Sequence, residues 1–264
     1  NPDKPFGGLA LYTVRDAMMK DARATLEKVA QAGYVNVESA GYNNGKFYNL
    51  SPADFKTLLD EMKLTPISAH QGSVTFANVD QQITDLKAAG FKYFVVPVPP
   101  MGTFIYDPVK KGMGMKGGAK ALAETLNILG AKCKAAGLEL LYHNHDFEFS
   151  EKLGDRTLFD IILGETDPKL VMQQLDIGNM INGGAKALDI MQKYPGRFES
   201  MHVKAEIESK AGHEKYESTI LNVGIVPVKE IIDLGRKWGT KHFIIEQESY
   251  QGKAPMECVR EDLE

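Results

Sequence analysis

The hydrophobic residues of this chain follow two alternating patterns. In the first pattern, apolar side chains recur three and four residues apart, as in Ala22, Leu26, Val29 and Ala30, which is the spacing of one face of an amphipathic helix. Seven segments show this spacing, within residues 22–30, 55–62, 79–86, 122–129, 158–162, 187–191 and 228–232. We therefore expect seven helices that each bury one face.

Short, almost continuously apolar runs lie between these segments. They cover residues 8–12, 35–38, 65–70, 91–97, 138–143, 171–176, 198–203 and 242–246. Continuous apolarity is typical of strands covered on both faces, as in a parallel sheet. Alternation of strand and helix over 264 residues favours a (β/α)₈ TIM barrel, with residues 1–264 forming a single domain.

An open, doubly wound sheet is the alternative architecture. A dinucleotide-binding sheet of that kind carries a GxGxxG motif after its first strand. Here the first apolar run leads into Tyr12, Thr13, Val14, Arg15 and Asp16, which contain no glycine. The closed barrel is therefore the preferred prediction.

Helix boundaries have their own signals. Four helical segments end in a glycine followed by a strand, at Gly33, Gly90, Gly137 and Gly239, and glycine readily takes the left-handed conformation that ends a helix. The pair Ser51-Pro52 is typical of a helix start, with serine as the N-cap and proline in the first turn.

Composition narrows the range of functions. Hydrophobic residues make up 43% of the chain and charged residues 25%, which is ordinary for a globular protein. A net charge of −4 without a lysine cluster argues against nucleic acid as a partner. No apolar run approaches the roughly 20 residues of a membrane helix. Cys133 and Cys258 are too few for a disulfide framework or a cysteine metal site.

These features leave a small molecule as the expected partner, and a homo-oligomer is compatible with the sequence. The chain begins at Asn1 rather than methionine, which would fit either cleavage of an export signal or trimming. The compartment is accordingly left open between the cytoplasm and the periplasm or exterior.

Polar residues collect where the predicted strands end. In a (β/α)₈ barrel these ends form one rim that carries the active site. Strands two and three end in Glu38 and His70, and strands five to eight run into "YHNHDFEF" (142–149), "QLDIGN" (174–179), "MHVKAE" (201–206) and "IIEQES" (244–249). Imidazole and carboxylate groups from separate strands suit a divalent metal such as Mn²⁺, Zn²⁺, Co²⁺ or Mg²⁺.

Together with "LALYTVRDAM" (9–18) on strand one, these motifs resemble the xylose-isomerase-like barrel superfamily over essentially the whole chain. The superfamily includes sugar isomerases and epimerases, inosose dehydratase and endonuclease IV. The resemblance implies one divalent metal ion, bound by one residue from each of strands five to eight. It assigns Asp176, His202 and Glu246 as ligands.

Strand five departs from the pattern of the superfamily. Epimerases of the superfamily usually place a glutamate at its end, whereas this chain has His143, followed by His145 and Glu148. We predict His143 as the fourth ligand because it occupies the end of the strand, with the other two residues as alternatives. The missing glutamate argues against a simple epimerase mechanism with two glutamates.

The resemblance implies removal of a proton next to the carbonyl of a keto-sugar, a 3-keto-glycoside or an inosose. The candidate acid and base groups are Glu246, Glu148, His145 and Lys204. The candidate substrate contacts are Glu38, His70, Asn179 and Glu248. The product could arise by a lyase or dehydratase reaction, which the histidine-rich rim favours, or by an isomerase or epimerase reaction.

Two alternatives come from other classes of protein. One is a carbohydrate-binding barrel without catalysis, and the other is a metal-dependent phosphodiesterase like endonuclease IV. The latter would need more zinc ligands and a basic surface. The charged segment 205–222 is expected to be a long loop that either covers the end of strand seven or lies in solvent.

Overall fold

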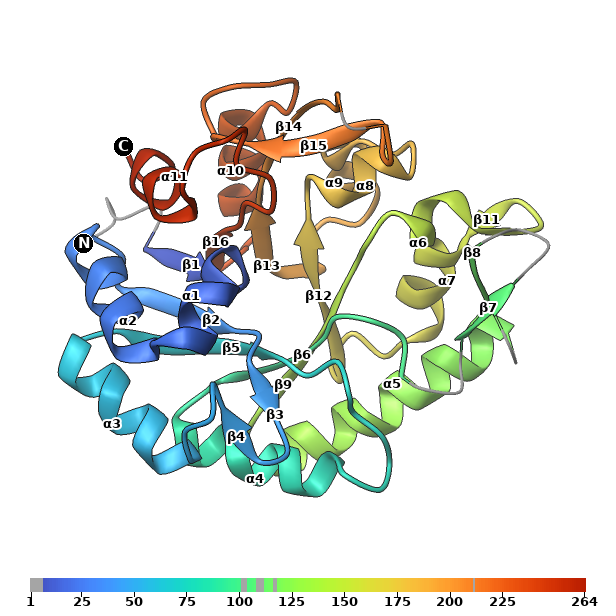
Figure 1. Cartoon of the computed structure of the whole chain (residues 1–264). Coiled ribbons are helices and arrows are strands. Elements are labelled where there is room, and N and C mark those ends of the chain that lie inside the picture. Colours follow the sequence, from blue (N-terminus) through green and yellow to red (C-terminus); the bar gives the residue numbers. More distant parts are fainter. Residues whose placement is uncertain (1–6, 101–103, 108–111, 116–117, 211) are drawn as a thin grey trace.

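Eight parallel strands close into a barrel at the centre of the molecule (Figure 1). The computed structural model describes residues 7–100, 104–107, 112–115, 118–210 and 212–264, with backbone only for 104–107 and 112–115. The barrel strands, in chain order, are β1 (Gly8–Ala10), β2 (Asn36–Ser39), β5 (Thr65–His70), β6 (Tyr93–Val96), β9 (Glu139–His143), β12 (Val171–Asp176), β13 (Phe198–Val203) and β16 (His242–Ile245). The closed (β/α)₈ barrel is confirmed, and the open sheet is excluded.

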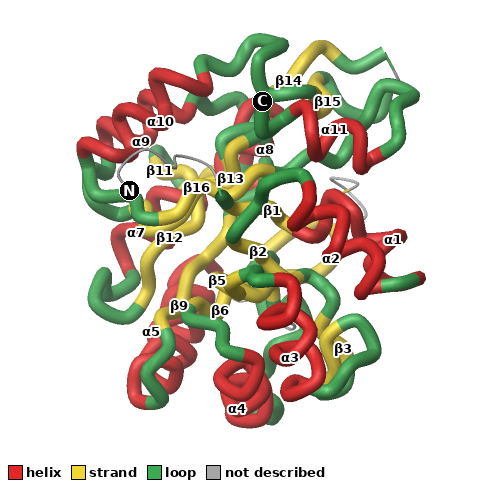
Figure 2. The backbone as a smooth tube through the Cα atoms, turned by 90° about the vertical axis from the view of Figure 1, so that its left-hand side faces the viewer, coloured by secondary structure: helices red, strands yellow, loops and turns green. Residues whose placement is uncertain are grey.

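Helices form the outer layer, as the red segments around the yellow strands in Figure 2 show. The longer ones are α2 (Ala22–Gln31), α3 (Pro52–Met62), α4 (Val79–Ala89), α5 (Gly118–Ala135), α7 (Leu158–Glu165), α9 (Ala187–Lys193), α10 (Val228–Lys237) and α11 (Pro255–Glu261). The seven expected helices are all present. Neighbours in this layer pack against each other, α2 on α3, α3 on α4, α4 on α5 and α5 on α7. Among the described residues, no helix has the length and apolarity needed to span a bilayer.

The predicted helix ends are confirmed by backbone geometry. Gly33, Gly90, Gly137 and Gly239 all have positive φ angles, between 82° and 106°, so each takes the left-handed conformation expected there. At the start of α3, the Ser51 hydroxyl accepts a hydrogen bond from a backbone N–H in the first turn of the helix. Local sequence thus determines where these helices begin and end.

Two apolar layers stabilise the barrel. The larger lies between the strands and the helices, where it includes Phe94 and Val96 of β6. The smaller is formed by Ile67, Tyr93, Val95 and Leu141. Since successive side chains of a strand point to opposite sides, Tyr93 and Val95 point into the barrel, and this small cluster fills its interior.

The first strand is shorter than predicted. The expected strand covered residues 8–12, but β1 ends at Ala10 and Leu11–Val14 forms a 3₁₀ turn, η1. Thr13 explains the difference, because its hydroxyl accepts a hydrogen bond from the Gln247 backbone and its carbonyl accepts one from the Tyr250 hydroxyl. These contacts with the segment after β16 pull the chain out of strand geometry.

Four antiparallel hairpins follow the carboxyl ends of barrel strands. They are β3–β4 (Tyr42–Asn43 and Lys46–Phe47), β7–β8 (Phe104–Asp107 and Gly112–Met115), β10–β11 (Lys152–Leu153 and Arg156–Thr157) and β14–β15 (Ala205–Glu208 and Tyr216–Thr219). Three short helices also lie in the loops, α1 (Arg15–Lys20), α6 (Phe147–Ser150) and α8 (Asn179–Asn182). The segment 205–222, expected to be a loop, instead contains the hairpin β14–β15.

Candidate metal and substrate site

Asp176 is the last residue of β12 and lies next to His202 in the register of β12 and β13. Its Oδ1 atom accepts hydrogen bonds from the backbone N–H groups of Gly178 and Asn179, at 3.0 and 2.8 Å. This turn fixes the orientation of the carboxylate. The other oxygen, Oδ2, is buried and makes no well-directed hydrogen bond with the described residues.

Three nitrogen atoms surround that oxygen. Asp176 Oδ2 lies 3.0 Å from Lys204 Nζ, 3.6 Å from His202 Nδ1 and 3.7 Å from His143 Nε2. The Glu246 carboxylate joins them, because its Oε2 atom lies 3.0 Å from His202 Nδ1 and 2.8 Å from Lys204 Nζ. Side chains from four adjacent strands or strand ends therefore point at one buried position.

Hydrogen bonds on the far side of each imidazole orient the two rings. Gln174 donates through Nε2 to Glu38 Oε2, so its Oε1 atom accepts a hydrogen bond of 2.9 Å from His143 Nδ1. This bond places the proton of a neutral His143 on Nδ1 and leaves Nε2 facing Asp176. The Nε2 atom of His202 donates to Glu38 Oε1, which directs its Nδ1 atom toward Asp176 and Glu246 in the same way.

The donor set suits a divalent cation. Metal–ligand distances of about 2.0–2.2 Å place two ligands of one ion about 3.0–3.5 Å apart. The separations of 3.0, 3.6 and 3.7 Å among the nitrogen and oxygen atoms of His143, Asp176, His202 and Glu246 are close to that range. A carboxylate that orients a ligating imidazole, as Glu38 orients His202, is also characteristic of metal sites.

Lys204 supplies positive charge to the same cluster. It is 1% exposed, and its ammonium group contacts Asp176, Glu246 and Glu248. Burial alone would lower the pKa of Lys204, but the three carboxylates hold that pKa well above its usual value. Lys204 is therefore a permanent cation beside the two carboxylates.

The pKa values of the other groups reflect the same balance. Burial alone would raise the pKa of Asp176 and of Glu246, but Lys204 and His202 hold both well below their usual values. Burial opposes the charge of His202, yet Glu38 and Glu246 raise its pKa. His143 differs, because burial and the neighbouring imidazoles lower its pKa. A neutral His143 and two ionised carboxylates are the forms that bind metals.

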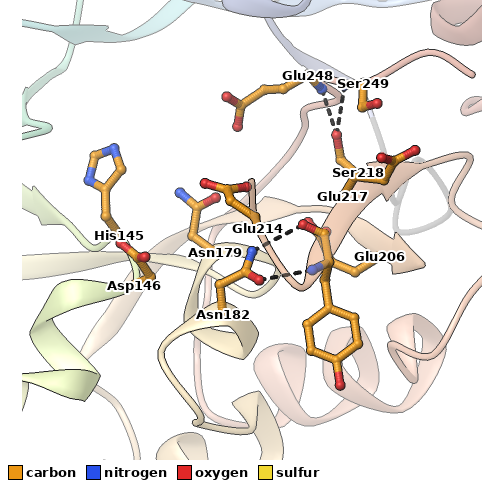
Figure 3. Close-up of a pocket in the computed structure, with 11 residues that line it drawn as sticks. His145, Asp146, Asn179, Asn182, Glu206, Glu214, Glu217, Ser218, Glu248 and Ser249 are labelled. Atoms are coloured by element: carbon orange, nitrogen blue, oxygen red, sulfur yellow. Dashed lines mark hydrogen bonds between the residues drawn. The ribbon is translucent and has the colours of Figure 1, made fainter. Parts of the chain in front are cut away.

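Figure 3 shows the residues that line a cavity of about 250 Å³. Asn179 and Glu248 line it, and both also contact Lys204 Nζ, at 3.2 and 2.5 Å. His145 from the loop after β9 and Glu206 from β14 line it as well. The cavity thus gives a small molecule access to the neighbourhood of Lys204 and the buried carboxylates.

Comparison with known proteins gives a partial match in sequence and a match of the whole fold. No protein-family model matches the chain. A segment of 85 residues is 35% identical to inosose dehydratase from Clostridium perfringens, but it covers 32% of this chain and 28% of that enzyme. The sequence match therefore spans less than a third of the length of that relative.

Solved structures match over almost the full length. A sugar phosphate isomerase/epimerase from Parabacteroides distasonis has a TM-score of 0.77 and 24% identity, covering 97% of this chain and 95% of that one. A xylose isomerase-like TIM barrel protein from Mycobacterium smegmatis in complex with magnesium has a TM-score of 0.67 and 14% identity, covering 93% and 86%. This chain has the fold of the xylose isomerase-like barrels. The resemblance predicted from the sequence is confirmed.

Within this barrel, the residues predicted as metal ligands come together. Two groups of donors, each with its ligand atoms within 4.8 Å of one another, share His202. The first contains Asp176 and Glu246, and the second contains His70 and His143. The assignment of His143 as the fourth ligand stays a prediction, since His143 shares a group with His202 but not with Asp176 and Glu246, and its Nε2 atom lies 3.7 Å from Asp176 Oδ2.

The predicted substrate contacts divide into two pairs. Asn179 and Glu248 line the cavity. Glu38 is buried beneath the imidazoles, where it accepts hydrogen bonds from Ser68 and Gln174 as well as from His202, and His70 bonds to Gln174 Oε1 at 2.8 Å. This position suits Glu38 for orienting other side chains rather than for touching a substrate.

The predicted acid and base groups also occupy different places. His145 lines the cavity, and its buried Nδ1 atom has no hydrogen-bond partner among the described residues. Glu148 is fully buried, with its oxygens accepting hydrogen bonds from the Tyr142 hydroxyl and the His145 backbone. Glu148 lies outside the lining of the cavity and holds the loop that carries His145.

Two residues of this candidate site, Gln174 and Glu206, were not among the residues predicted from the sequence. Gln174 connects His70, His143 and Glu38, and Glu206 lines the cavity while being 3% exposed. Strand periodicity could have indicated both. Gln174 precedes Asp176 by two residues, and Glu206 follows Lys204 by two, so each shares a face with a residue that was predicted.

Proposed function

We propose that this protein is a divalent-metal-dependent enzyme that removes a proton next to the carbonyl of a keto-sugar, a 3-keto-glycoside or an inosose. The observation that carries the proposal is the convergence of imidazole and carboxylate atoms from four strands on one buried position beside a cavity. Perturbed, buried titratable groups next to a cavity at the carboxyl ends of barrel strands are typical of an active site.

His143, Asp176, His202 and Glu246 would hold the metal ion. When bound, such an ion polarises a carbonyl oxygen and favours negative charge on it. Lys204 contributes in the same direction, because its ammonium group remains charged and lies 3.2 Å from Asn179 at the edge of the cavity. A substrate oxygen that gains negative charge would be stabilised by this fixed cation.

His145 is the proposed base among the cavity-lining groups. Burial lowers the pKa of its imidazole, so a neutral ring is available, and its Nδ1 atom is not occupied by another described residue. Glu246 is the second candidate, since it is 5% exposed and lies next to Lys204. The base must come within hydrogen-bond reach of the carbon that loses its proton.

We further propose a dehydratase or lyase outcome in preference to isomerisation or epimerisation. The partial sequence match to inosose dehydratase supports elimination. So does the chemistry of the rim, because the His145 imidazole, once it has taken the proton from carbon, can pass that proton to a departing hydroxyl group. The charged Lys204 ammonium group can stabilise the departing oxygen by a hydrogen bond. Epimerisation would need a second base on the opposite face, and strand five offers His143 where a glutamate would serve.

A carbohydrate-binding barrel without catalysis is the second candidate. Lys204 favours it, because its ammonium group already contacts both Asp176 and Glu246 and balances part of their charge. Such a protein would need no divalent ion. A phosphodiesterase is disfavoured, since carboxylates line the cavity and would repel a phosphate backbone.

The proposal is tested by incubating the metal-loaded protein in D₂O with 3-keto-glycosides, inososes and ketoses, and following each by NMR. An accepted substrate should exchange its hydrogen next to the carbonyl for deuterium or lose it by elimination. Turnover without exchange or loss of that hydrogen would indicate hydride transfer or hydrolysis. Binding without turnover and without dependence on metal would favour the second candidate.

A further inference from the structure

Glu206 occupies an unusual position in the cavity. The residue is 3% exposed, no hydrogen bond joins its carboxyl group to a described residue, and neither carboxyl oxygen is among the fully enclosed unpartnered atoms, so the group opens onto the cavity that it lines (Figure 3). Burying a polar group without a partner is unfavourable. A buried carboxyl group that faces a cavity without a protein partner is therefore well suited to bind a ligand.

The backbone holds Glu206 firmly. It pairs with Ser218 in the hairpin β14–β15, and its carbonyl accepts a hydrogen bond of 2.9 Å from the Ile225 N–H. The Ser218 hydroxyl in turn accepts hydrogen bonds from the backbone N–H groups of Glu248 and Ser249. The hairpin is thus attached to the segment after β16 that carries Glu248, and hydrogen bonds fix the position of this cavity wall.

Gly178 makes room for the Glu206 side chain. A Cβ atom at Gly178 would lie 2.5 Å from Glu206 Oε1 and 2.7 Å from Lys204 Cδ, and such short contacts do not occur without a shift. The glycine of the "LDIGN" motif therefore allows Glu206 and Lys204 to approach the turn after Asp176. This contact places the Glu206 carboxyl group next to the proposed reaction site.

The cavity is strongly acidic. Besides Glu206, its lining includes Asp146, Glu214, Glu217 and Glu248 and contains no lysine or arginine among the described residues. Lys204 below it is already engaged by three carboxylates. The nearby N–H groups of Gly178 and Asn179 donate to Asp176. Phosphate is normally bound by arginine, lysine or free backbone N–H groups. The described lining offers no arginine or lysine, and the N–H groups of the turn after Asp176 are engaged.

We propose that Glu206 is a substrate-recognition residue whose carboxyl group binds a hydroxyl group on an uncharged, polyhydroxylated part of the substrate. The other carboxylates of the cavity reject phosphorylated substrates by charge repulsion. This inference rests on the proposed function, because it assigns the cavity to the part of the sugar that extends away from the metal-binding residues.

The state of the carboxyl group is consistent with this role. Burial raises the pKa of Glu206 to about 8, so the group is mainly protonated at neutral pH. A protonated carboxyl group offers one donor and one acceptor, which matches a sugar hydroxyl. Carboxylates around the rim can accept further hydroxyl hydrogen bonds.

The test is a ligand-observed NMR titration of the full chain at neutral pH with two matched pairs of probes. These are myo-inositol against myo-inositol 1-phosphate, and D-glucose against D-glucose 6-phosphate. At least one neutral polyol should bind at millimolar concentration, with its phosphate binding at least about tenfold more weakly. Equal or tighter binding of the phosphates would overturn the inference, as would failure of both neutral polyols to bind.

Variants of Glu206 make the test specific. Glu206→Ala should weaken binding of the neutral polyol by about three- to tenfold, the worth of one hydrogen bond. Glu206→Gln, which keeps a donor and an acceptor, should retain most of the affinity. Glu208→Ala is the matched control, since Glu208 lies on the same strand but is exposed and outside the cavity lining. Equal affinities of Glu206→Ala and Glu208→Ala would refute the role of Glu206.

This binding test and the deuterium exchange test can fail separately. Selective binding of a neutral polyol, without exchange on any keto-sugar, would refute the proposed reaction and leave the recognition by Glu206 standing. Exchange on phosphorylated keto-sugars at undiminished rates would refute the recognition and leave the reaction standing.

Discussion

The two ends of the barrel both contain buried carboxylates, but they use them differently. At the amino end, Glu199 accepts hydrogen bonds from the Tyr93 hydroxyl at 2.8 Å and from Lys241 Nζ at 2.6 Å, and the Lys241 side chain is 55% exposed. At the carboxyl end, Asp176 and Glu246 share a fully buried lysine with each other. The hydrogen-bond partners of Glu199 are enough to account for its burial. Two carboxylates that converge on one buried position indicate a function instead.

The region between the two ends keeps them apart. Tyr93, Val95 and Leu141 are fully buried in the interior cluster, so apolar side chains fill the barrel between its two ends. Low polarity beneath the carboxyl end strengthens the electrostatic interactions there. It also makes an unpaired charge at that end costly.

The largest contrast is expected between Asp176→Asn and Glu199→Gln, which remove one negative charge at opposite ends. Asparagine can keep the turn at Oδ1 but loses the charged Oδ2 atom, so bound metal and turnover should fall by more than about a hundredfold. Glu199→Gln keeps acceptors for Tyr93 and Lys241 and should leave both unchanged. Metal content by elemental analysis and the turnover rate distinguish the variants. Full metal content in folded Asp176→Asn protein would contradict the assignment.

A lysine substitution should lower the free energy of unfolding far more at the carboxyl end of the barrel than at the amino end, and Lys204→Met tests the carboxyl end. Removing this cation leaves Asp176 and Glu246 buried with His202 as their remaining positive partner, and breaking a buried ion pair in this way costs about 3–5 kcal/mol. Divalent metal should restore much of this loss, because it supplies positive charge at the same carboxylates. Denaturant unfolding with and without metal measures the effect. The control is Lys241→Met at the amino end, where loss of a half-exposed lysine should cost much less and be insensitive to metal.

Glu38→Gln tests orientation rather than ligation. Glutamine cannot accept from Ser68, Gln174 and His202 with a full negative charge, so His202 should be held less well. Metal affinity should weaken by about 10- to 100-fold, the usual effect of removing such a supporting carboxylate. Calorimetric titration with Mn²⁺ gives the affinity. An unchanged affinity would make Glu38 a packing residue only.

Glu148→Gln should change the dependence of stability on pH. Burial raises the pKa of Glu148 from 4.5 to about 8, so the folded state binds a proton that the unfolded state has lost between these values. The contribution of Glu148 is therefore fully present below about pH 4.5 and is lost as pH rises through 8, at about 1 kcal/mol per pH unit. The free energy of unfolding of Glu148→Gln should therefore fall less steeply with rising pH than that of the wild-type protein. The prediction would be contradicted if the free energies of unfolding of the two proteins changed with pH in the same way from pH 5 to 8.

The sequence predicted the positions of His143, Asp176, His202 and Glu246 at one rim because parallel strands in a barrel end on the same side. It did not predict the interactions below the rim. Register shifts lie beside Glu38 and Gln174, where the partner strands β5 and β13 each carry one extra residue. Such a shift changes which side chains meet across neighbouring strands, and the sequence gives no signal for it.

The hairpin β3–β4 has a clear turn signal in the sequence, whereas β14–β15 has none. Asn44 and Gly45 have φ angles of 47° and 79°, as in the tight turn that an Asn-Gly pair favours, so β3–β4 could have been predicted. The hairpin β14–β15 carries no such pair in its connection. Its charged sequence resembles a solvated loop, and only the tertiary contacts of Ser218 with the segment after β16 place Glu206 in the cavity.

The central claim is that four side chains at the carboxyl end of the barrel hold one divalent ion. Anomalous diffraction from crystals grown with Mn²⁺ tests it most directly. The account predicts one strong peak about 2.0–2.3 Å from the ligating atoms of Asp176, His202 and Glu246, with His143 Nε2 at a similar distance. A peak located elsewhere, or no peak between these side chains at saturating Mn²⁺, would contradict it.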